Sequence, residues 1–321
     1  MTRPTLLERA GEAASGVSSL GSGNPRRKAI LQYGIAALIF GFLIFFVARQ
    51  WNQLPDFDWR FEPGWLALSA VCVAGYYALQ AELWRGIVAS LGEHIDGKAS
   101  RALWGKSLLA RYVPTNVLML VGRIVMAEKH GVPKRVTFAS VVYELGLAFG
   151  TAVMVGAYFV IELPDLQGQP GRFAVLAVVP IVLTGFHPRV FEPVVNFALG
   201  KLGREPLPTV LPFGRVLGLC LAYTLCWGLI GLSLFAFASG LHPIDLSDLP
   251  YVAASYPVAF CVAVLTFVVP SGIGTRDAAL ATAMAAVLAG AVATAIAVAF
   301  RIFQTVIELL FVAAVSALER R

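Results

Sequence analysis

The feature that most restricts the fold is a series of apolar segments, each long enough to approach or cross a membrane. Continuous ones lie near 29–50, 64–83, 137–161, 173–186, 214–239 and 291–317, and interrupted ones lie near 107–126 and 251–289. A helix needs about 20 apolar residues to cross the roughly 30 Å hydrocarbon core of a bilayer. Because lipid cannot satisfy backbone polar groups, such segments fold as helices. We predict an all-α polytopic membrane protein with about six to eight transmembrane helices.

Composition supports this class. Of 321 residues, 58% are hydrophobic and 14% are charged, and the mean hydropathy is +0.75, outside the range of soluble domains. The net charge of +6 comes from basic residues scattered between apolar runs, so we expect no nucleic-acid partner. We expect residues 1–28 to be a disordered cytoplasmic tail and residues 29–321 to form a single transmembrane domain. The first apolar run is too long for a signal-peptide core, which indicates a retained anchor.

Charges in the connections predict the orientation. The connections near 55–62, 162–172 and 242–250 are mainly acidic, whereas most Lys and Arg lie in the tail, the other connections and the C-terminus. By the positive-inside rule the acidic connections are external, so both termini should be cytoplasmic in a cell (inner) membrane. The run at 173–186 holds 14 residues and Pro180, and only the basic connection after it indicates that it crosses.

Two segments break at similar places, one in each half of the domain (about 29–162 and 173–318). Residues 110–123 read A-R-Y-V-P-T-N-V-L-M-L-V-G-R, and residues 269–277 read V-P-S-G-I-G-T-R-D. Backbone broken at membrane depth is tolerated only where protein or a water-filled cavity covers it. Flanking charges predict that the first hairpin enters from the cytoplasmic face and the second from the external face. Re-entrant hairpins from opposite faces form an inverted repeat, the arrangement of many alternating-access transporters.

A helix with polar side chains along one face follows each break. Helix spacing aligns Arg301, Gln304, Thr305 and Glu308 in one half, and Thr137, Ser140 and Glu144 in the other. An ionisable group at the bilayer centre costs at least about 2.5–3.5 kcal/mol, so these groups should face partners or a wet cavity. We predict that the charged residues of the hairpins and helices converge near the midplane. In the alternative interpretation, Arg301 and Glu308 form a pair that only fixes the helices.

This combination suits an anionic headgroup, because guanidinium groups bind phosphate oxygens in pairs and a half-helix N-terminus offers free N–H donors. The glutamates would set the local charge or take a proton. The glycines of the broken segments could instead serve as hinges or allow close packing. For Gly146 and Gly150, which form a G-x-x-x-G spacing, we expect close helix packing. The residues that we expect to bind substrate are Arg111, Pro114, Thr115, Arg123, Glu144, Pro270, Ser271, Gly272, Gly274, Arg276, Asp277, Arg301 and Glu308.

No motif of familiar chemistry is present. The four cysteines lie in apolar segments without C-x-x-C spacing, and the four histidines show no H-E-x-x-H spacing. The sequence also contains neither a G-x-S-x-G turn nor a nucleotide loop. We therefore expect no catalytic residues, no metal and no cofactor. Trp51, Trp59, Trp65 and Trp104 lie near predicted span ends, where we expect an aromatic belt without a binding role.

The broken segments resemble the flippase-like membrane family, whose best-known members form the transmembrane half of lysylphosphatidylglycerol synthases. The matching pieces are R-Y-V-P…G-R from Arg111 to Arg123, Glu144, and P-S-G-I-G-T-R-D from Pro270 to Asp277. The family commonly has P-G in place of Pro114-Thr115 and Glu in place of Asp277. The resemblance implies movement of lipid between leaflets. We expect no aminoacyl transfer, because the sequence contains no soluble synthase domain.

These observations favour a lipid translocase for a phospholipid or a polyprenyl-phosphate-linked sugar. The alternative is a membrane-embedded enzyme or an obligate subunit of a glycolipid or cell-envelope assembly system. A third interpretation, a structural scaffold, explains the packing glycines but not the paired charged breaks. A translocase leaves the mass of the lipid unchanged, whereas an enzyme changes it. The sequence leaves the direction of transport, its energy source and the oligomeric state open, and a homo-oligomer is compatible with it.

Overall fold

The fold is known from a computed structural model that describes residues 60–109, 116–163, 166–201, 206, 210–265 and 275–320. In these ranges the chain is helical and contains no strand, so the predicted all-α class is confirmed. The elements are α3 (Pro63–Ser90), α4 (Gly97–Leu109), α5 (Asn116–Glu128), α6 (Lys134–Glu162), η3 (Pro170–Ala177), α7 (Val178–Gly185), α8 (Pro188–Lys201), α9 (Phe213–Leu241), η4 (Leu246–Asp248), α10 (Leu249–Leu265), α11 (Thr275–Met284) and α12 (Gly290–Glu319).

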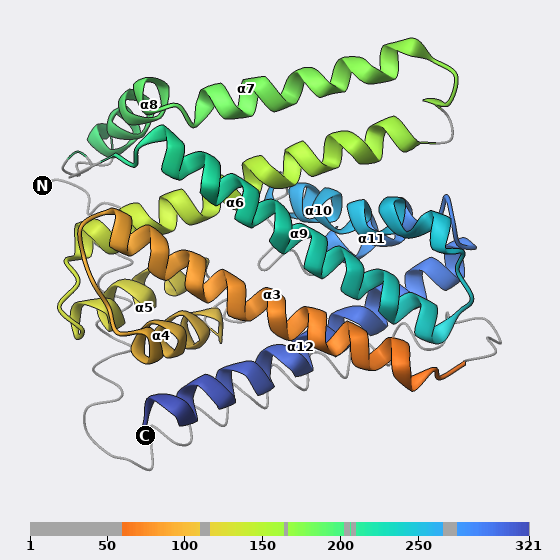
Figure 1. Cartoon of the computed structure of the whole chain (residues 1–321), viewed down its shortest axis with the longest axis horizontal. Coiled ribbons are helices and arrows are strands. Elements are labelled where there is room, and N and C mark those ends of the chain that lie inside the picture. Colours follow the sequence, from red (N-terminus) through yellow and green to blue (C-terminus); the bar gives the residue numbers. More distant parts are fainter. Residues whose placement is uncertain are drawn as a thin grey trace, which may run out of the picture.

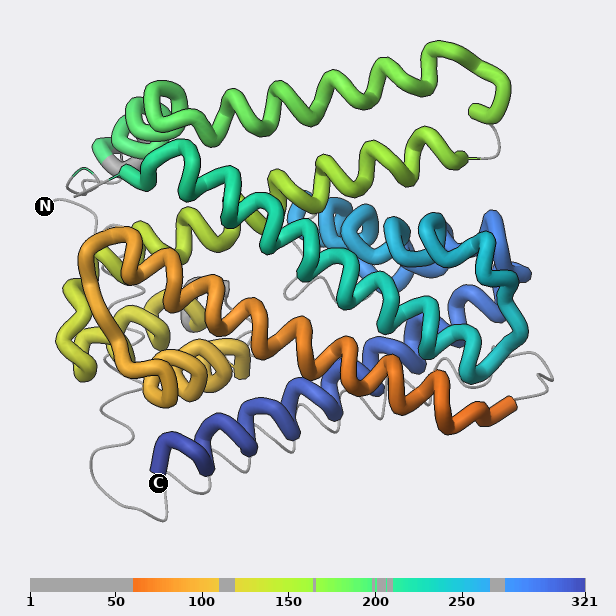
Figure 2. The backbone as a smooth tube through the Cα atoms, in the orientation of Figure 1, coloured from red at the N-terminus to blue at the C-terminus, as the bar shows by residue number. Residues whose placement is uncertain are grey.

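Four long helices, α3, α6, α9 and α12, run along the length of the molecule (Figures 1 and 2). Helix α9 packs along α3, α10 packs against both α6 and α9, and α12 contacts α3, α4 and α11. Within the described ranges, these four helices and the continuous η4–α10 segment are long and apolar enough to cross a membrane, giving five candidate spans. The predicted first span, near 29–50, lies outside the described residues.

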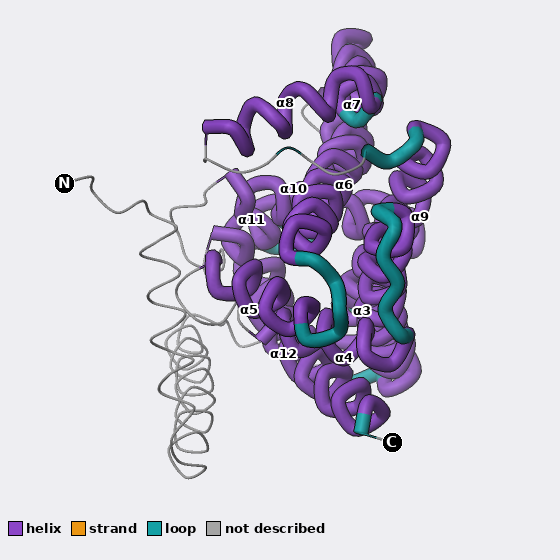
Figure 3. The backbone as a smooth tube through the Cα atoms, turned by 90° about the vertical axis from the view of Figure 1, so that its left-hand side faces the viewer, coloured by secondary structure: helices purple, strands orange, loops and turns teal. Residues whose placement is uncertain are grey.

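The segment predicted to cross at 173–186 does not form one straight span. It comprises η3 and α7, which meet the length and composition of a span only together with α8, and the two parts are bent by 72° at the break between them. If that bent pair counts as one span, the described part of the chain has up to six. Both η3–α7 and α8 lie along one edge of the bundle, away from α4 and α12 (Figures 1 and 3).

The described parts of the acidic and basic connections lie at opposite ends of the bundle. One end gathers α4, α5, α8 and the last turn of α12 (left in Figure 1), where Lys106 forms an ion pair with Glu319. The other end gathers the start of α3 and the end of α9, joined by a hydrogen bond from Glu62 N to Gly240 O at 3.0 Å. In the connections that the structure describes, the predicted separation of charge is therefore present. That the basic end is cytoplasmic remains a prediction.

Each predicted break separates two helices that pack against each other. The pair α4 and α5 flanks the first break, and the pair α10 and α11 flanks the second. The first pair lies at the basic end, and the second lies in the opposite half of the molecule (Figure 1). Seven predicted site residues lie outside the described residues: Arg111, Pro114, Thr115, Pro270, Ser271, Gly272 and Gly274.

Glycines allow two close contacts between helices. A Cβ atom on Gly150 would lie 2.6 Å from a ring carbon of Phe186, and one on Gly146 would lie 3.4 Å from the same ring. The close packing predicted for this G-x-x-x-G pair is therefore confirmed, and the partner is the ring that caps α7. A Cβ on Gly231 of α9 would lie 2.6 Å from the carbonyl oxygen of Ala253, so α10 can approach α9 only because Gly231 has no side chain.

Candidate functional site

Arg123 of α5 is the buried cation of the first half. Its side chain is 2% exposed and forms an ion pair with Glu144 of α6. Its Nε atom donates to Ser107 Oγ at 3.0 Å, and its guanidinium lies 5.4 Å from the ring centroid of Trp84. The structure thus joins two of the predicted site residues directly, and neighbouring side chains surround the cation.

The partners of Glu144 complete this cluster. Trp104 Nε1 donates to Glu144 Oε1 at 2.8 Å, and Trp84 Nε1 donates to Ser140 Oγ at 3.0 Å. The expectation that Trp104 belongs to an aromatic belt is wrong, because its side chain is buried and bonds the carboxylate. Sequence position alone was misleading here: Trp104 lies near the end of an apolar segment, but α4 packs inward against α3, α5 and α12.

Arg276 of α11 corresponds to Arg123 in the second half, and its hydrogen-bond partners among the described residues are neutral. Its Nη2 atom donates to Gln304 Oε1 at 2.8 Å and also to the Tyr256 hydroxyl. The guanidinium lies 4.6 Å from the ring centroid of Tyr256, and Tyr256 in turn donates to Gln304 Oε1 at 2.9 Å. Among the described residues Arg276 forms no salt bridge, and its Nε atom is buried without a hydrogen-bond partner.

Asp277 and Arg301 form the second ion pair between predicted site residues. Arg301 Nη1 lies 3.2 Å from Asp277 Oδ1, and the side chains are 13% and 6% exposed. The alternative in which Arg301 pairs with Glu308 is therefore wrong, because the first turn of α11 supplies the carboxylate. Helix spacing along α12 could not reveal a partner that another helix contributes.

Glu308 contacts the first half of the chain. Tyr77 of α3 donates from its hydroxyl to Glu308 Oε2 at 2.7 Å, and the ring centroids of Tyr77 and Trp104 are 6.4 Å apart. Because Trp104 bonds Glu144, the two predicted glutamates belong to one chain of contacts across the bundle. The predicted convergence is indirect, since aromatic side chains separate the charged groups. Sequence reasoning missed Tyr77 and Tyr256, because a tyrosine in an apolar helix carries no signal of its partner.

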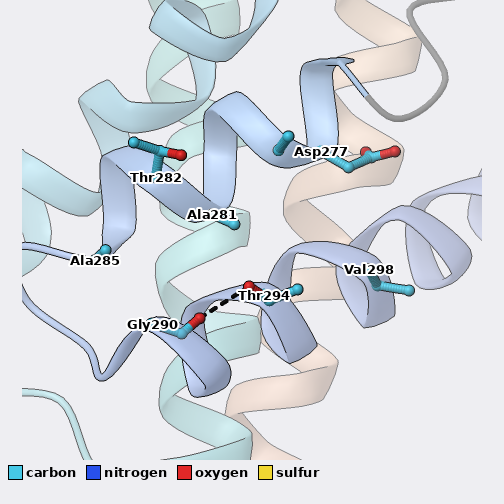
Figure 4. A pocket seen from close by; sticks show the side chains of 8 residues that line it. Asp277, Ala281, Thr282, Ala285, Gly290, Thr294 and Val298 are labelled. Atoms are coloured by element: carbon cyan, nitrogen blue, oxygen red, sulfur yellow. Dashed lines mark hydrogen bonds between the residues drawn. The ribbon is translucent and has the colours of Figure 1, made fainter. Parts of the chain in front are cut away.

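A cavity lies between α11 and α12, beside Asp277 (Figure 4). Its volume is about 390 Å³, and it is lined by Asp277, Ala278, Ala281, Thr282, Ala285, Gly290, Thr294 and Val298. It extends from the connection between the two helices to the first turn of α11. The Thr294 hydroxyl donates to the carbonyl oxygen of Gly290 at 2.8 Å. The small side chains leave room beside Asp277, the charged residue of the lining.

The described residues contain no group of three or more His, Cys, Asp or Glu arranged to hold a metal ion. Their cysteines, Cys72, Cys220, Cys226 and Cys261, are free thiols. The polar groups that the fold gathers are arginines, carboxylates, tyrosines and amides. Chemically, such a set can bind anions and hold charge inside an apolar bundle.

Comparisons with known proteins identify the family. No curated protein matches the chain, and neither does a solved structure. Residues 30–311 match the family described as the lysylphosphatidylglycerol synthase TM region. Because this match covers most of the chain, and the fold is an all-helical bundle with candidate membrane spans, the protein is a membrane protein that belongs to the lysylphosphatidylglycerol synthase TM family.

Proposed function

We propose that this protein is a lipid translocase that moves a phosphate-bearing lipid, either a phospholipid or a polyprenyl-phosphate-linked sugar, between leaflets. The observation that carries the proposal is Arg276, a cation held among transmembrane helices by a phenol and an amide. A charged group in a low-dielectric site requires a partner. Tyr256 and Gln304 orient the guanidinium without neutralising it, and the neighbouring Asp277 carboxylate forms its ion pair with Arg301, so an anionic ligand would complete the environment of Arg276.

The contacts of Arg123 in the first half indicate a role different from that of Arg276. This side chain already has a carboxylate, a hydroxyl and an aromatic face as partners, and it is nearly inaccessible. A phosphate could reach it only by displacing Glu144 from a buried pair. We therefore assign Arg123 and Glu144 to the frame of the bundle and Arg276 to the ligand, although the sequence predicts equivalent roles for both arginines.

Translocation would proceed by shielding of the headgroup. The headgroup would enter the bundle beside Arg276 while the lipid tails stay in the bilayer. The phosphate would then keep polar partners, and the apolar chains would stay in hydrocarbon. The sequence contains no nucleotide-binding motif, so the movement would be passive or coupled to an ion. No bond in the lipid would form or break, which separates this proposal from an enzymatic role.

The test is a leaflet-accessibility assay in proteoliposomes with fluorescent phospholipids and polyprenyl-phosphate lipids. Wild-type protein should speed the movement of one lipid class. A charge-assisted hydrogen bond contributes about 1.5–3 kcal/mol, so Arg276→Ala should slow the movement by roughly 10- to 100-fold. Arg85→Ala is the matched control, because Arg85 lies at an exposed position of α3 and forms a surface pair with Glu82.

Mass spectrometry of the recovered lipids completes the test. Unchanged lipid masses together with Arg276-dependent movement would support a translocase. A changed mass would support the membrane-embedded enzyme instead. Equal rates in wild type and a folded Arg276→Ala protein would contradict the assignment of Arg276 to the ligand.

A further inference from the structure

We propose that the cavity between α11 and α12 receives the anionic headgroup, and that Arg301 exchanges Asp277 for the phosphate when the headgroup enters. This inference rests on the proposed function and adds a second phosphate-binding residue and an entry route. Asp277 lines the cavity, and Arg301 is its ion-pair partner at 3.2 Å. Arg301 itself is not among the lining residues, so a ligand in the cavity would meet the carboxylate first and reach the guanidinium when the ion pair opens.

The size and walls of the cavity suit a headgroup. Its volume of about 390 Å³ is near the lower end of small-molecule sites, which run from about 300 to 1,000 Å³. This space accommodates a phosphodiester with a small polar group but leaves the acyl chains outside. The lining beside Asp277 includes Ala278, Ala281 and Thr282, whose side chains are short (Figure 4).

The balance of charge favours an anion. The first turn of α11 and the facing turn of α12 bring together Arg276, Asp277 and Arg301, two cations and one carboxylate. The next carboxylate on this face of α12, Glu308, lies seven residues beyond Arg301 and accepts a hydrogen bond from Tyr77. Gln304, which also faces this group, is neutral. Neither arginine lines the cavity, so a phosphate would reach them after the Asp277–Arg301 pair opens. A phosphate bound to both would satisfy the buried Nε atom of Arg276, which has no hydrogen-bond partner among the described residues. A cationic ligand would instead add to an excess of positive charge.

Adjacent positions on α11 make the exchange geometrically direct. Arg276 bonds Gln304 and Asp277 pairs with Arg301, so two consecutive residues fix the start of α11 to α12. Loss of the Asp277–Arg301 pair would leave the Arg276 contact in place. The ion pair can therefore open for the ligand without separating the two helices, and Asp277 acts as a competitor that the phosphate displaces.

The experiment measures occupancy of the cavity by cysteine protection. Thr282→Cys places a thiol in the cavity wall, and Ala291→Cys places one on an exposed position of α12 outside the lining. Alkylation by N-ethylmaleimide is followed in proteoliposomes, and the reactivity of the native cysteines is measured in the parent protein as the baseline. The probes are dihexanoyl phosphatidylglycerol, inorganic phosphate and choline.

The short-chain phospholipid should protect Thr282→Cys and leave Ala291→Cys unaffected. In the Thr282→Cys background, Arg301→Gln should raise the concentration for half-protection about tenfold, because one guanidinium is lost. Asp277→Asn should lower it, because the competing carboxylate is removed. These opposite shifts distinguish an exchange from a structural pair, whose disruption from either side would weaken protection in the same direction.

Three results would overturn the inference. These are protection by choline in place of the anionic probes, protection by inorganic phosphate alone, and shifts of the same sign in both variants. The proposed function is tested separately by leaflet movement. If the protein moves lipid in an Arg276-dependent manner while Thr282→Cys stays unprotected, the translocase stands and the cavity inference fails.

Discussion

The hydroxyl of Tyr77 lies 2.7 Å from Oε2 of Glu308 and donates a hydrogen bond to it, which joins α3 to the middle of α12. Both side chains are buried. The same tyrosine ring stacks on Phe311 at a centroid distance of 5.8 Å and tilts toward Trp104. Tyr77 and Trp104 together thus connect the glutamates of the two halves.

Tyr77→Phe should destabilise the protein by about 1–3 kcal/mol, because the buried Glu308 carboxylate loses the hydrogen bond from the Tyr77 hydroxyl while the ring packing stays. The measurement is thermal or denaturant unfolding in detergent micelles. Tyr158→Phe is the control, since Tyr158 is 40% exposed, and it should leave stability nearly unchanged. Equal stability of the two variants would show that the Tyr77 hydrogen bond contributes nothing.

Arg123→Ala should destabilise the bundle severely, by about 3–5 kcal/mol, because Glu144 would remain buried without its cation. The double variant Arg123→Leu with Glu144→Gln should recover part of that loss, since it removes both charges. Yield of monodisperse protein and unfolding midpoints report the effect. If the single variant folds normally and loses only transport, Arg123 belongs to the ligand site, contrary to our assignment.

Gly231→Ala should destabilise the contact between α9 and α10, because the new Cβ would lie 2.6 Å from a backbone oxygen that cannot rotate away. We expect a loss of about 1–3 kcal/mol, as for other overpacked sites. Gly228→Ala on the same helix is the matched control, since no atom lies within 4 Å of its new Cβ. It should be neutral or slightly stabilising, because alanine favours helix. A similar loss in both variants would indicate a general effect of substitution on α9.

Asp96 should make the stability of α4 dependent on pH. Its Oδ2 atom accepts backbone hydrogen bonds from Ala99 at 3.2 Å and from Lys98 at 2.9 Å. These bonds hold the pKa of the Asp96 carboxyl below its usual value, and the bond from Ala99 has the larger effect. The stabilisation is therefore complete above the pKa of Asp96 in the unfolded chain and is lost as pH falls through the lower folded value.

The Asp96 prediction is checked by measuring unfolding of wild type, Asp96→Asn and Asp96→Ala from about pH 7 to about pH 3, which spans the usual range for Asp. The stability advantage of wild type over Asp96→Ala should shrink toward acid. Asparagine caps helices without titrating in this range, so the advantage of Asp96→Asn over Asp96→Ala should stay constant. An advantage of wild type that stays constant across the range would contradict the predicted linkage.

The sequence by itself determined the class of protein, the positions of the long helices and the two interrupted segments. Length and hydropathy suffice for these features, because a helix in lipid satisfies its own backbone and needs no information from distant residues. The separation of acidic and basic connections also follows from the sequence, because the charged residues of each connection can be read directly from it. The bend between α7 and α8 could not be read from composition, since an apolar run of that length forms either a span or part of one.

Only the tertiary structure decided which charges meet. Helix spacing correctly aligned Arg301, Gln304 and Glu308 on one face, but their partners Asp277, Arg276 and Tyr77 come from two other helices. The tertiary structure also distinguished the two arginines, which look equivalent in the sequence. Arg123 pairs with a carboxylate, whereas Arg276 donates to an amide and a phenol. The physical reason is that ion pairs and hydrogen bonds depend on distances of a few ångströms between helices, and helical periodicity determines only the face on which a side chain lies.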